Sequence, residues 1–162
     1  MQCIRWDELM KNENDKKKYE QQLDVLGQES SMVQELRQPI TSVTLLYEVK
    51  SRQEKHRVYV LLDHGDIFGY LKVGLKHLYY AAKSGFMEID PLCLLDFYVQ
   101  TQRQGHGLLL FQYMLDSEKQ QARNLAFDRP SPKLYPFLNK HFGLVDYVPQ
   151  SNRFVVFDAY FK

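Results

Sequence analysis

Residues 92–107 read LCLLDFYVQTQRQGHG, an apolar run followed by a short, basic, glycine-containing turn. The apolar run from Leu92 to Val99 predicts a buried strand, and the amphipathic residues that follow predict a helix starting near His106. A strand that ends in small residues and opens a helix presents free backbone N–H groups at the positive end of the helix dipole. The stretch therefore predicts an anion site suited to a phosphate or pyrophosphate.

The composition is that of a globular protein, with 162 residues, 44% hydrophobic residues and a net charge of +1. This length predicts one domain over residues 1–162, with residues 1–20 irregular or incomplete. The small net charge gives no field that favours nucleic acid or a membrane surface. Cys3 and Cys93 lack metal-ligand spacing and fit a reducing setting. With no membrane span or signal peptide in the pattern, we expect a cytoplasmic protein without a metal.

The first third of the chain is expected to be helical and then extended. Apolar residues recur at three- and four-residue steps over residues 15–34, which predicts a helix. Gly27 is expected to end that helix, and Ser30 or Ser31 to cap a second short turn. The β-branched residues within 40–49 predict a strand.

The middle of the chain is expected to form antiparallel strands. Residues 51–55 read as a charged turn, and residues 57–63 alternate as a strand does. His64-Gly65-Asp66 reads as a tight turn that joins this strand to a long one over residues 67–81. Residues 87–99 then contain the central strand.

The last third is expected to alternate helices and strands. In order, the expected elements are a helix over 108–121, a strand over 125–128, a helix over 132–141 capped by Ser131 and ended by Gly143, and strands over 144–148 and 154–161. Strand–helix–strand units such as 92–128 are right-handed crossovers with parallel strands. Ligands of open α/β sheets bind at the carboxyl ends of such strands. A cleft is therefore expected between residues 97–107 and 128–131.

Gly-x-Gly alone carries little information, because a chain of this length contains about one such pair by chance. Its context is more specific, since an apolar strand precedes it, Arg103 lies within it and a helix follows. The turn lacks the Lys-Ser/Thr of a nucleotide-binding loop and the third glycine of a dinucleotide turn. Gln-x-x-Gly-x-Gly at residues 102–107 closely resembles the pyrophosphate loop of the Gcn5-related N-acetyltransferases (GNATs).

Seven ordered blocks between about residue 22 and residue 162 resemble one GNAT family, the alpha-tubulin N-acetyltransferases. The blocks are QPITS (38–42), GYLKVG (69–74), LCLLDFY (92–98), LFQYML (110–115), AFDRPS (126–131), FLNKH (137–141) and VPQSN (148–152). The resemblance implies an α/β GNAT fold, in which a mixed central sheet is flanked by helices and two split parallel strands hold acetyl-CoA. It also implies acetyl transfer to a lysine of alpha-tubulin inside the microtubule lumen.

The resemblance implies three catalytic residues. Asp128 would take a proton from the substrate lysine, whose pKa is about 10.4 in water; without the resemblance it reads as a helix cap or a partner of Arg129. Cys93 would have an auxiliary acid–base or positioning role rather than form an acetyl-enzyme, although a cysteine on an apolar strand is by default an inert thiol. Cys93 lies about 13 Å from Phe97 along a straight strand, so a bulge or a deep cleft must bring it closer. Gln34 would orient the substrate lysine or Asp128.

The resemblance further implies the residues that bind acetyl-CoA and the substrate. Phe97, Tyr98 and Val99 would offer backbone groups to the acetyl and pantetheine arm. Residues 102–108 (Gln102, Arg103, Gln104, Gly105, His106, Gly107 and Leu108) would hold the pyrophosphate, with Arg103 as its charge partner. Ser131, Lys133, Phe137, Asn139 and Lys140 would flank the cofactor, although solvated surface lysines are common. Arg129, Asn152 and Phe154 would contact tubulin; a turn and a core residue are the alternatives for Asn152 and Phe154.

The sequence departs from the family in three places. The segment between Val99 and Gln102 is about two residues shorter than usual, and Leu45 replaces a basic residue near the substrate site. The chain before residue 20 does not match, which suggests that a first strand is missing.

We therefore expect a monomeric, cytoskeleton-associated enzyme that acts on alpha-tubulin and polymerised microtubules, including those of axonemes, and binds neither nucleic acid nor membrane. Direct transfer in a ternary complex is the expected mechanism. The alternatives are an acetyltransferase for another protein or a small amine, and a non-catalytic microtubule-binding relative.

Overall fold

The computed structural model describes residues 1–101 and 105–162. Its centre is the antiparallel hairpin of β2 (Arg57–Asp63) and β3 (Asp66–Leu75). His64 and Gly65 join the two strands with positive φ angles of 52° and 79°. This is the backbone geometry of a two-residue hairpin turn, which glycine adopts without strain. The predicted turn at residues 64–66 is therefore confirmed.

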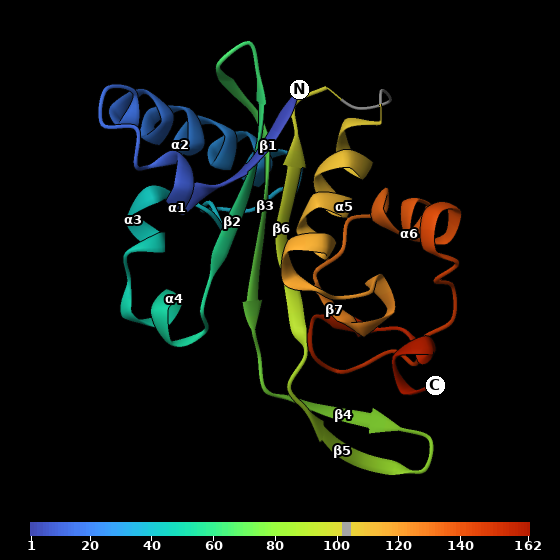
Figure 1. The fold of residues 1–162 in the computed structure, drawn as a ribbon. Coiled ribbons are helices and arrows are strands. Elements are labelled where there is room, and N and C mark those ends of the chain that lie inside the picture. Colours follow the sequence, from blue (N-terminus) through green and yellow to red (C-terminus); the bar gives the residue numbers. More distant parts are fainter. Residues whose placement is uncertain (102–104) are drawn as a thin grey trace.

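Six strands form one sheet in the order β1-β2-β3-β6-β7-β8 (Figure 1). The remaining members are β1 (Gln2–Arg5), β6 (Leu92–Val99), β7 (Leu125–Asp128) and β8 (Phe154–Val156). β6 and β7 are parallel, and the other neighbouring strands are antiparallel. The predicted mixed sheet with one parallel crossover is confirmed.

β1 corrects the expectation that a first strand is missing. Residues 2–5 pair antiparallel with β2, so that Gln2 lies opposite Leu62 and Arg5 opposite Tyr59. The short α1 (Trp6–Leu9) follows and buries Trp6 and Leu9. Four residues hold too little periodicity to be recognised as a strand, and the free edge of β2 decides their conformation.

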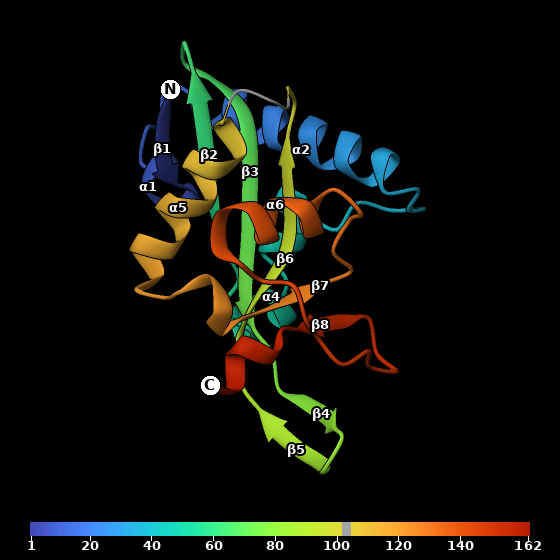
Figure 2. The same ribbon diagram turned by 90° about the vertical axis from the view of Figure 1, so that its right-hand side faces the viewer.

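Helices cover both faces of the sheet (Figures 1 and 2). α5 (His106–Glu118) and α6 (Leu134–Phe142) lie on one face, over a core that includes Leu71, Leu94 and Phe127. α1 to α4 lie on the other face, where α2 (Lys16–Val33) covers the sheet with Leu23 and Leu26. None of the helices in the described part of the chain is long and apolar enough to span a membrane.

α2 continues through Gly27, which was expected to end it. The reason is packing, because a Cβ atom on Gly27 would lie 2.1 Å from the backbone oxygen of Thr41. The glycine allows the loop after α2 to approach the helix. Ser30 and Ser31 are buried within the helix and do not cap a second turn.

Residues 40–49 do not form the predicted strand. They contain α3 (Val43–Leu46), which begins at Ser42, whose side chain accepts a hydrogen bond from the Leu45 N–H. The predicted charged turn at residues 51–55 mostly falls in α4 (Val49–Gln53). The Ser51 hydroxyl donates to the Leu45 carbonyl at 2.6 Å and ties the two helices together. These side-chain caps outweigh the weak β propensity of the segment.

The long strand expected over residues 67–81 is divided in two. β3 ends at Leu75, whose N–H donates to the Glu54 carbonyl at 2.7 Å. The chain then leaves the sheet as a separate hairpin of β4 (Leu78–Ala82) and β5 (Gly85–Ile89). The hairpin extends from one end of the molecule (Figure 1).

The C-terminal third differs from prediction at its element ends. α5 starts at His106 as expected, and the strand at 125–128 is confirmed, after a 3-10 turn, η1 (Ala122–Asn124). α6 starts at Leu134 rather than Pro132, because residues 131–133 form a turn. Residues 144–148 form one isolated bridge, between Tyr147 and Phe157, instead of a strand. The last predicted strand is shortened to β8 and followed by a 3-10 turn, η2 (Asp158–Phe161).

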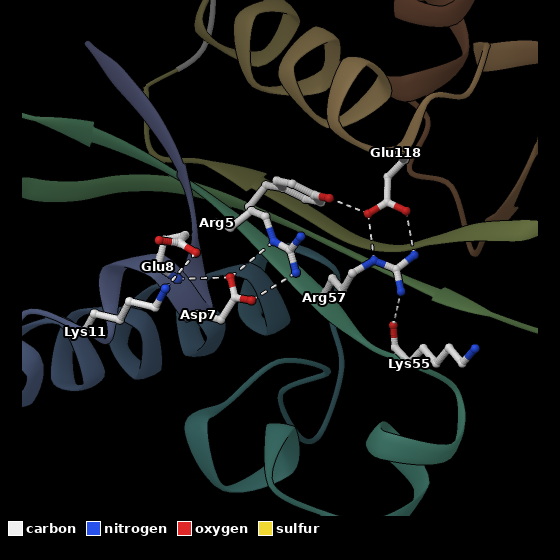
Figure 3. Close-up of polar contacts among 8 residues, drawn as sticks. Arg5, Asp7, Glu8, Lys11, Lys55, Arg57 and Glu118 are labelled. Carbon is white, nitrogen blue, oxygen red and sulfur yellow. Dashed lines mark hydrogen bonds and ion pairs between the residues drawn. The ribbon is translucent and has the colours of Figure 1, made fainter.

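An ion pair joins the end of α5 to β2 (Figure 3). The Arg57 guanidinium donates to both oxygens of Glu118, at 2.7 and 2.5 Å. The Tyr59 hydroxyl donates to the same carboxylate. Hydrogen bonds from Arg57 and Tyr59 outweigh the effect of burial and lower the pKa of Glu118.

Candidate active site

The parallel strands β6 and β7 part soon after they meet. They pair only where Leu92–Leu94 lie opposite Leu125–Phe127. β6 continues to Val99 beside β3, whereas β7 ends at Asp128. From Leu95 onward, the edge of β6 that faces β7 has no partner among the described strands. Its backbone groups can therefore pair with an extended ligand, as in β-strand addition.

A β-bulge in β6 decides which side chains share a face. Lys72 pairs with Asp96 and Val73 with Leu94, so Leu95 is an extra residue. Because side chains alternate along a strand, this extra residue brings Cys93 and Asp96, three positions apart, onto the same face. Leu92, Leu94, Phe97 and Val99 all belong to the core under α5 and α6, on the opposite face. We expected either a bulge or a deep cleft to be needed to bring Cys93 closer to Phe97, and β6 contains a bulge.

Asp128 ends β7 at the point where the strands part. Its side chain is 9% exposed, and Oδ1 accepts a hydrogen bond from Arg153 Nε at 2.8 Å. The Nε atom of Arg129 lies 4.0 Å from the same oxygen. Burial raises the pKa of Asp128 above its ordinary value, and Arg153 opposes that rise. A carboxylate with a raised pKa is a better proton acceptor than one in water.

Cys93 is completely buried beside Ala126, its register partner on β7. Its thiol donates to the Pro91 carbonyl at 3.6 Å. Burial raises the pKa of Cys93 to about 12, and the charge of Asp128 contributes to the rise. The group is therefore a neutral thiol at neutral pH, which is a poor nucleophile.

Gln34 contacts a buried carboxylate, Asp96, and not Asp128. Gln34 Nε2 donates to Ser30 Oγ at 2.9 Å and to Asp96 Oδ1 at 3.3 Å. Thr41 and Tyr70 donate to the other oxygen of Asp96, at 2.7 and 2.5 Å. α2, the loop after it, β3 and β6 therefore meet at one carboxylate.

A buried lysine lies on the same face as Asp96. Lys72 is 4% exposed, and its Nζ donates to the Ile40 carbonyl at 2.5 Å. Burial lowers its pKa to about 8, although Asp96 and Asp128 oppose the change. The neighbouring Lys76 pairs with Glu54 at 2.7 Å, and Glu54 with His56 at 2.9 Å.

The N-terminus of α5 lies beyond the free end of β6. Gly105 precedes the helix with a φ of 74°, and its carbonyl accepts the first intrahelical bond, from Leu109 at 3.0 Å. The N–H groups of residues 106–108 therefore precede that bond and have no acceptor within the helix, as in helix N-termini that bind anions. The Nδ1 atom of His106 is buried and has no hydrogen-bond partner among the described residues. The predicted cofactor residues Gln102, Arg103 and Gln104 lie outside the described residues.

Residues 3–162 match the family described as GNAT acetyltransferase, Mec-17. The chain belongs to this family. Because the match begins at residue 3, the expectation that the chain before residue 20 falls outside the family is wrong.

The Mec-17-family chain is similar to curated proteins named alpha-tubulin N-acetyltransferase. That of Phytophthora infestans is 45% identical over 86% of this chain and 87% of the relative. That of Tetrahymena thermophila is 48% identical over 88% of this chain, but this covers only 35% of the longer relative.

Solved structures agree on the fold of the Mec-17-family chain. A Bacillus halodurans protein superposes with a TM-score of 0.59 and 13% identity, over 94% of this chain and 98% of the other. The AtaT toxin, solved with its antitoxin and acetyl-CoA, has a TM-score of 0.51 and 19% identity, over 83% of this chain and 82% of the other. These similarities support the predicted GNAT fold.

The Mec-17-family chain brings the three expected substrate residues together. Arg129, Asn152 and Phe154 line a cavity of about 360 Å³ beside Asp128. Asn152 Oδ1 accepts the Phe154 N–H at 3.0 Å, as in a turn, and Phe154 is 9% exposed within a core cluster that includes Cys93. Asn152 is therefore a turn residue and Phe154 a core residue, as the structural alternatives for these two positions predicted.

The expected cofactor residues of α6 and of the turn before it differ in exposure. The ring of Phe137 lies against the free part of β6, with its centroid 6.2 Å from that of Phe97. It also contacts α5, where its centroid is 5.5 Å from that of Phe111. The others are exposed, namely Ser131, Lys133, Asn139 and Lys140. Within residues 1–101 and 105–162, no group of three or more His, Cys, Asp and Glu side chains is arranged to hold a metal ion.

Sequence reasoning missed Asp96, Lys72 and Arg153. Asp96 had a signal, since a carboxylate within an apolar strand must find partners when it is buried. Lys72 had the same signal, as the only charged residue within GYLKVG. The contact of Arg153 with Asp128 had none, because it depends on the pairing of β8 with β7.

Proposed function

We propose that this chain transfers the acetyl group of acetyl-CoA to a lysine of alpha-tubulin, directly and within a ternary complex. The observation that carries the proposal is the 45–48% identity, over more than four fifths of this chain, to proteins named for the acetylation of alpha-tubulin. The largely buried carboxylate of Asp128, where β6 and β7 part, supports it independently.

The described residues fit acetyl-CoA. The free edge of β6 at Phe97, Tyr98 and Val99 would pair with the extended pantetheine arm. The N–H groups of residues 106–108 would hold the pyrophosphate. Phe137 and the exposed side chains of Ser131, Lys133, Asn139 and Lys140 would flank the nucleotide. When bound, acetyl-CoA supplies an acetyl group activated as a thioester.

Asp128 would act as the base. A substrate lysine reaches the enzyme as an ammonium group and becomes nucleophilic only after it loses a proton. Asp128 would accept that proton, and the raised pKa of its carboxyl makes the transfer less unfavourable. Backbone N–H groups of β6 would face the carbonyl oxygen on which negative charge develops.

Cys93 and Gln34 would assist without covalent chemistry. With a pKa of about 12, the thiol of Cys93 can donate a hydrogen bond but does not supply a thiolate. Gln34 would act as a positioning residue, because it contacts Asp96 and thereby joins the end of α2 to β6. Arg129, Asn152 and Phe154 would line the approach of tubulin.

The proposed setting is the microtubule. We propose that the target lysine faces the lumen and that the enzyme acts as a cytoplasmic monomer on polymerised tubulin, including that of axonemes. Neither nucleic acid nor a membrane is part of the proposal. Leu45 and the short segment after Val99 would weaken contacts with tubulin and acetyl-CoA relative to the family.

The experiment is an acetylation assay with acetyl-CoA and microtubules, with free polyamines in a parallel reaction. We expect acetylated alpha-tubulin with the parent protein, its loss with Asp128→Asn, and no acetylation of polyamines. Acetylation of polyamines alone would point to a small-amine acetyltransferase. Co-sedimentation with microtubules without acetylation would point to a binding protein. Either result contradicts the proposal.

A further inference from the structure

The carboxylate of Asp128 is held at one oxygen and free at the other. Oδ1 accepts the hydrogen bond from Arg153 Nε at 2.8 Å. Oδ2 accepts no hydrogen bond from any residue in the described ranges 1–101 and 105–162. The second oxygen is therefore available to a lysine or a water in the space where β6 and β7 part.

The sheet fixes the position from which Arg153 reaches Asp128. Arg153 directly precedes β8, whose first residue, Phe154, is the register partner of Asp128. The Arg153 carbonyl accepts the Arg129 N–H at 2.9 Å. The guanidinium lies over the Phe154 ring, 5.6 Å from its centroid. Both the backbone and the side chain of Arg153 are therefore anchored beside the carboxylate.

We propose that Arg153 is a positioning residue that holds Oδ1 of Asp128, keeps this carboxylate ionised and leaves Oδ2 to accept the proton of the substrate lysine. The inference rests on the proposed function, in which Asp128 is the base. Arg153 and Arg129 line the same cavity, but Arg153 lies closer to Oδ1 of Asp128, so the inference gives the two arginines different roles.

Other charged or titratable groups also act on Asp128. Arg129 approaches from the turn after β7, Lys76 from the end of β3, Lys72 from within β3 and Cys93 from β6. Of these cations, Arg129 comes closest, at 4.0 Å, and none of the four groups is seen to donate a hydrogen bond to the carboxylate within the described residues. Arg153 should therefore have the largest single effect on the protonation of Asp128.

The test compares Arg153→Gln, Arg153→Lys and the parent in two measurements. The first is the pH dependence of kcat and KM for tubulin acetylation. The second is the pKa of the Asp128 carboxyl by carbon-detected NMR in the protein alone, with its signal assigned by Asp128→Asn. Arg123→Gln removes the same charge at an exposed position in η1, before Leu125, which itself lies about 10 Å from Asp128 along β7, and serves as the control.

We expect Arg153→Gln to raise the Asp128 pKa by about 1 unit, because it removes the nearest cation. The acidic limb of the kcat profile should move to higher pH by the same amount, with little change in KM. Arg153→Lys should restore most of the shift, and Arg123→Gln should match the parent. A purely structural role would lower thermal stability without moving the profile.

Three outcomes overturn the inference in distinguishable ways. If Arg153→Gln leaves both the NMR pKa and the profile unchanged while Asp128→Asn is inactive, only the role of Arg153 is wrong. If Asp128→Asn retains parent activity, the proposed base is wrong and the role of Arg153 is wrong with it. A lower KM in Arg153→Gln, with the profile unmoved, would mean that Arg153 competes with the substrate, which also contradicts the inference.

Discussion

Gly27→Ala should destabilise the protein, although it improves the helix propensity of α2. Alanine is favoured over glycine by about 1 kcal/mol within a helix. At position 27, however, the new Cβ would lie 2.1 Å from the Thr41 oxygen, where Cβ contacts under 3.0 Å essentially do not occur. The helix and the loop must therefore separate by roughly 0.9 Å.

The cost of that separation exceeds the gain in propensity. Forcing a methyl group into a packed interior costs about 1–3 kcal/mol. Thr41 also donates to the buried Asp96 at 2.7 Å, and a hydrogen bond to a charged group contributes about 1.5–3 kcal/mol. With the propensity gain subtracted, we expect a net loss of about 1.5–5 kcal/mol in the free energy of unfolding.

Urea denaturation followed by circular dichroism measures the change. The matched control is Gln21, an exposed residue of the same helix, as Gln21→Gly and Gln21→Ala. There, alanine should be more stable than glycine by about 1 kcal/mol, which calibrates propensity alone. Opposite signs at positions 21 and 27 support the packing argument. A Gly27→Ala variant more stable than the parent would refute it.

Three further predictions concern buried groups. Cys93, whose thiol has a pKa of about 12 and is fully buried, should resist alkylation by iodoacetamide in the folded protein and react in urea. Mass spectrometry measures the labelling rate of Cys93, and equal rates in the two conditions would contradict the burial. Thr41→Val should cost about 1.5–3 kcal/mol in urea denaturation because it removes one of the two hydroxyl groups that donate to the same oxygen of buried Asp96, leaving only Tyr70 there, and a neutral result would contradict that bond. Glu118→Gln should cost about 1–3 kcal/mol at pH 7. Because the pKa of Glu118 is below its ordinary 4.5 when folded, the parent's advantage is complete above that value and disappears as pH falls through the folded pKa. Thermal unfolding across pH measures this, and an advantage that persists in strong acid would contradict the linkage.

Local patterns were enough for the elements whose structure is local. The hairpin of β2 and β3 follows from alternating residues on either side of His64-Gly65, which accepts the positive φ angles of a tight turn. α2 and α5 follow from three- and four-residue periodicity. The order of β6, α5 and β7 implied a parallel crossover, since right-handed crossovers are nearly universal.

The errors occurred where a distant contact outweighs local preference. Gly27 resembles a helix end, but the approach of Thr41 requires a glycine within α2. Residues 40–49 contain β-branched side chains, yet Ser42 caps a helix there. The four residues of β1 become a strand because β2 offers them an edge.

The sequence by itself determined the family, the central strand and the candidate catalytic residues Asp128, Cys93 and Gln34, because motifs and periods are carried by neighbouring residues. Only the tertiary structure decided which contacts those residues make. The bulge at Leu95 places Cys93 and Asp96 on one face of β6. Asp96 accepts a hydrogen bond from Gln34, and the pairing of β8 with β7 places Arg153 beside Asp128. Register and bulges depend on both strands of a pair, so a pattern along one segment does not contain them.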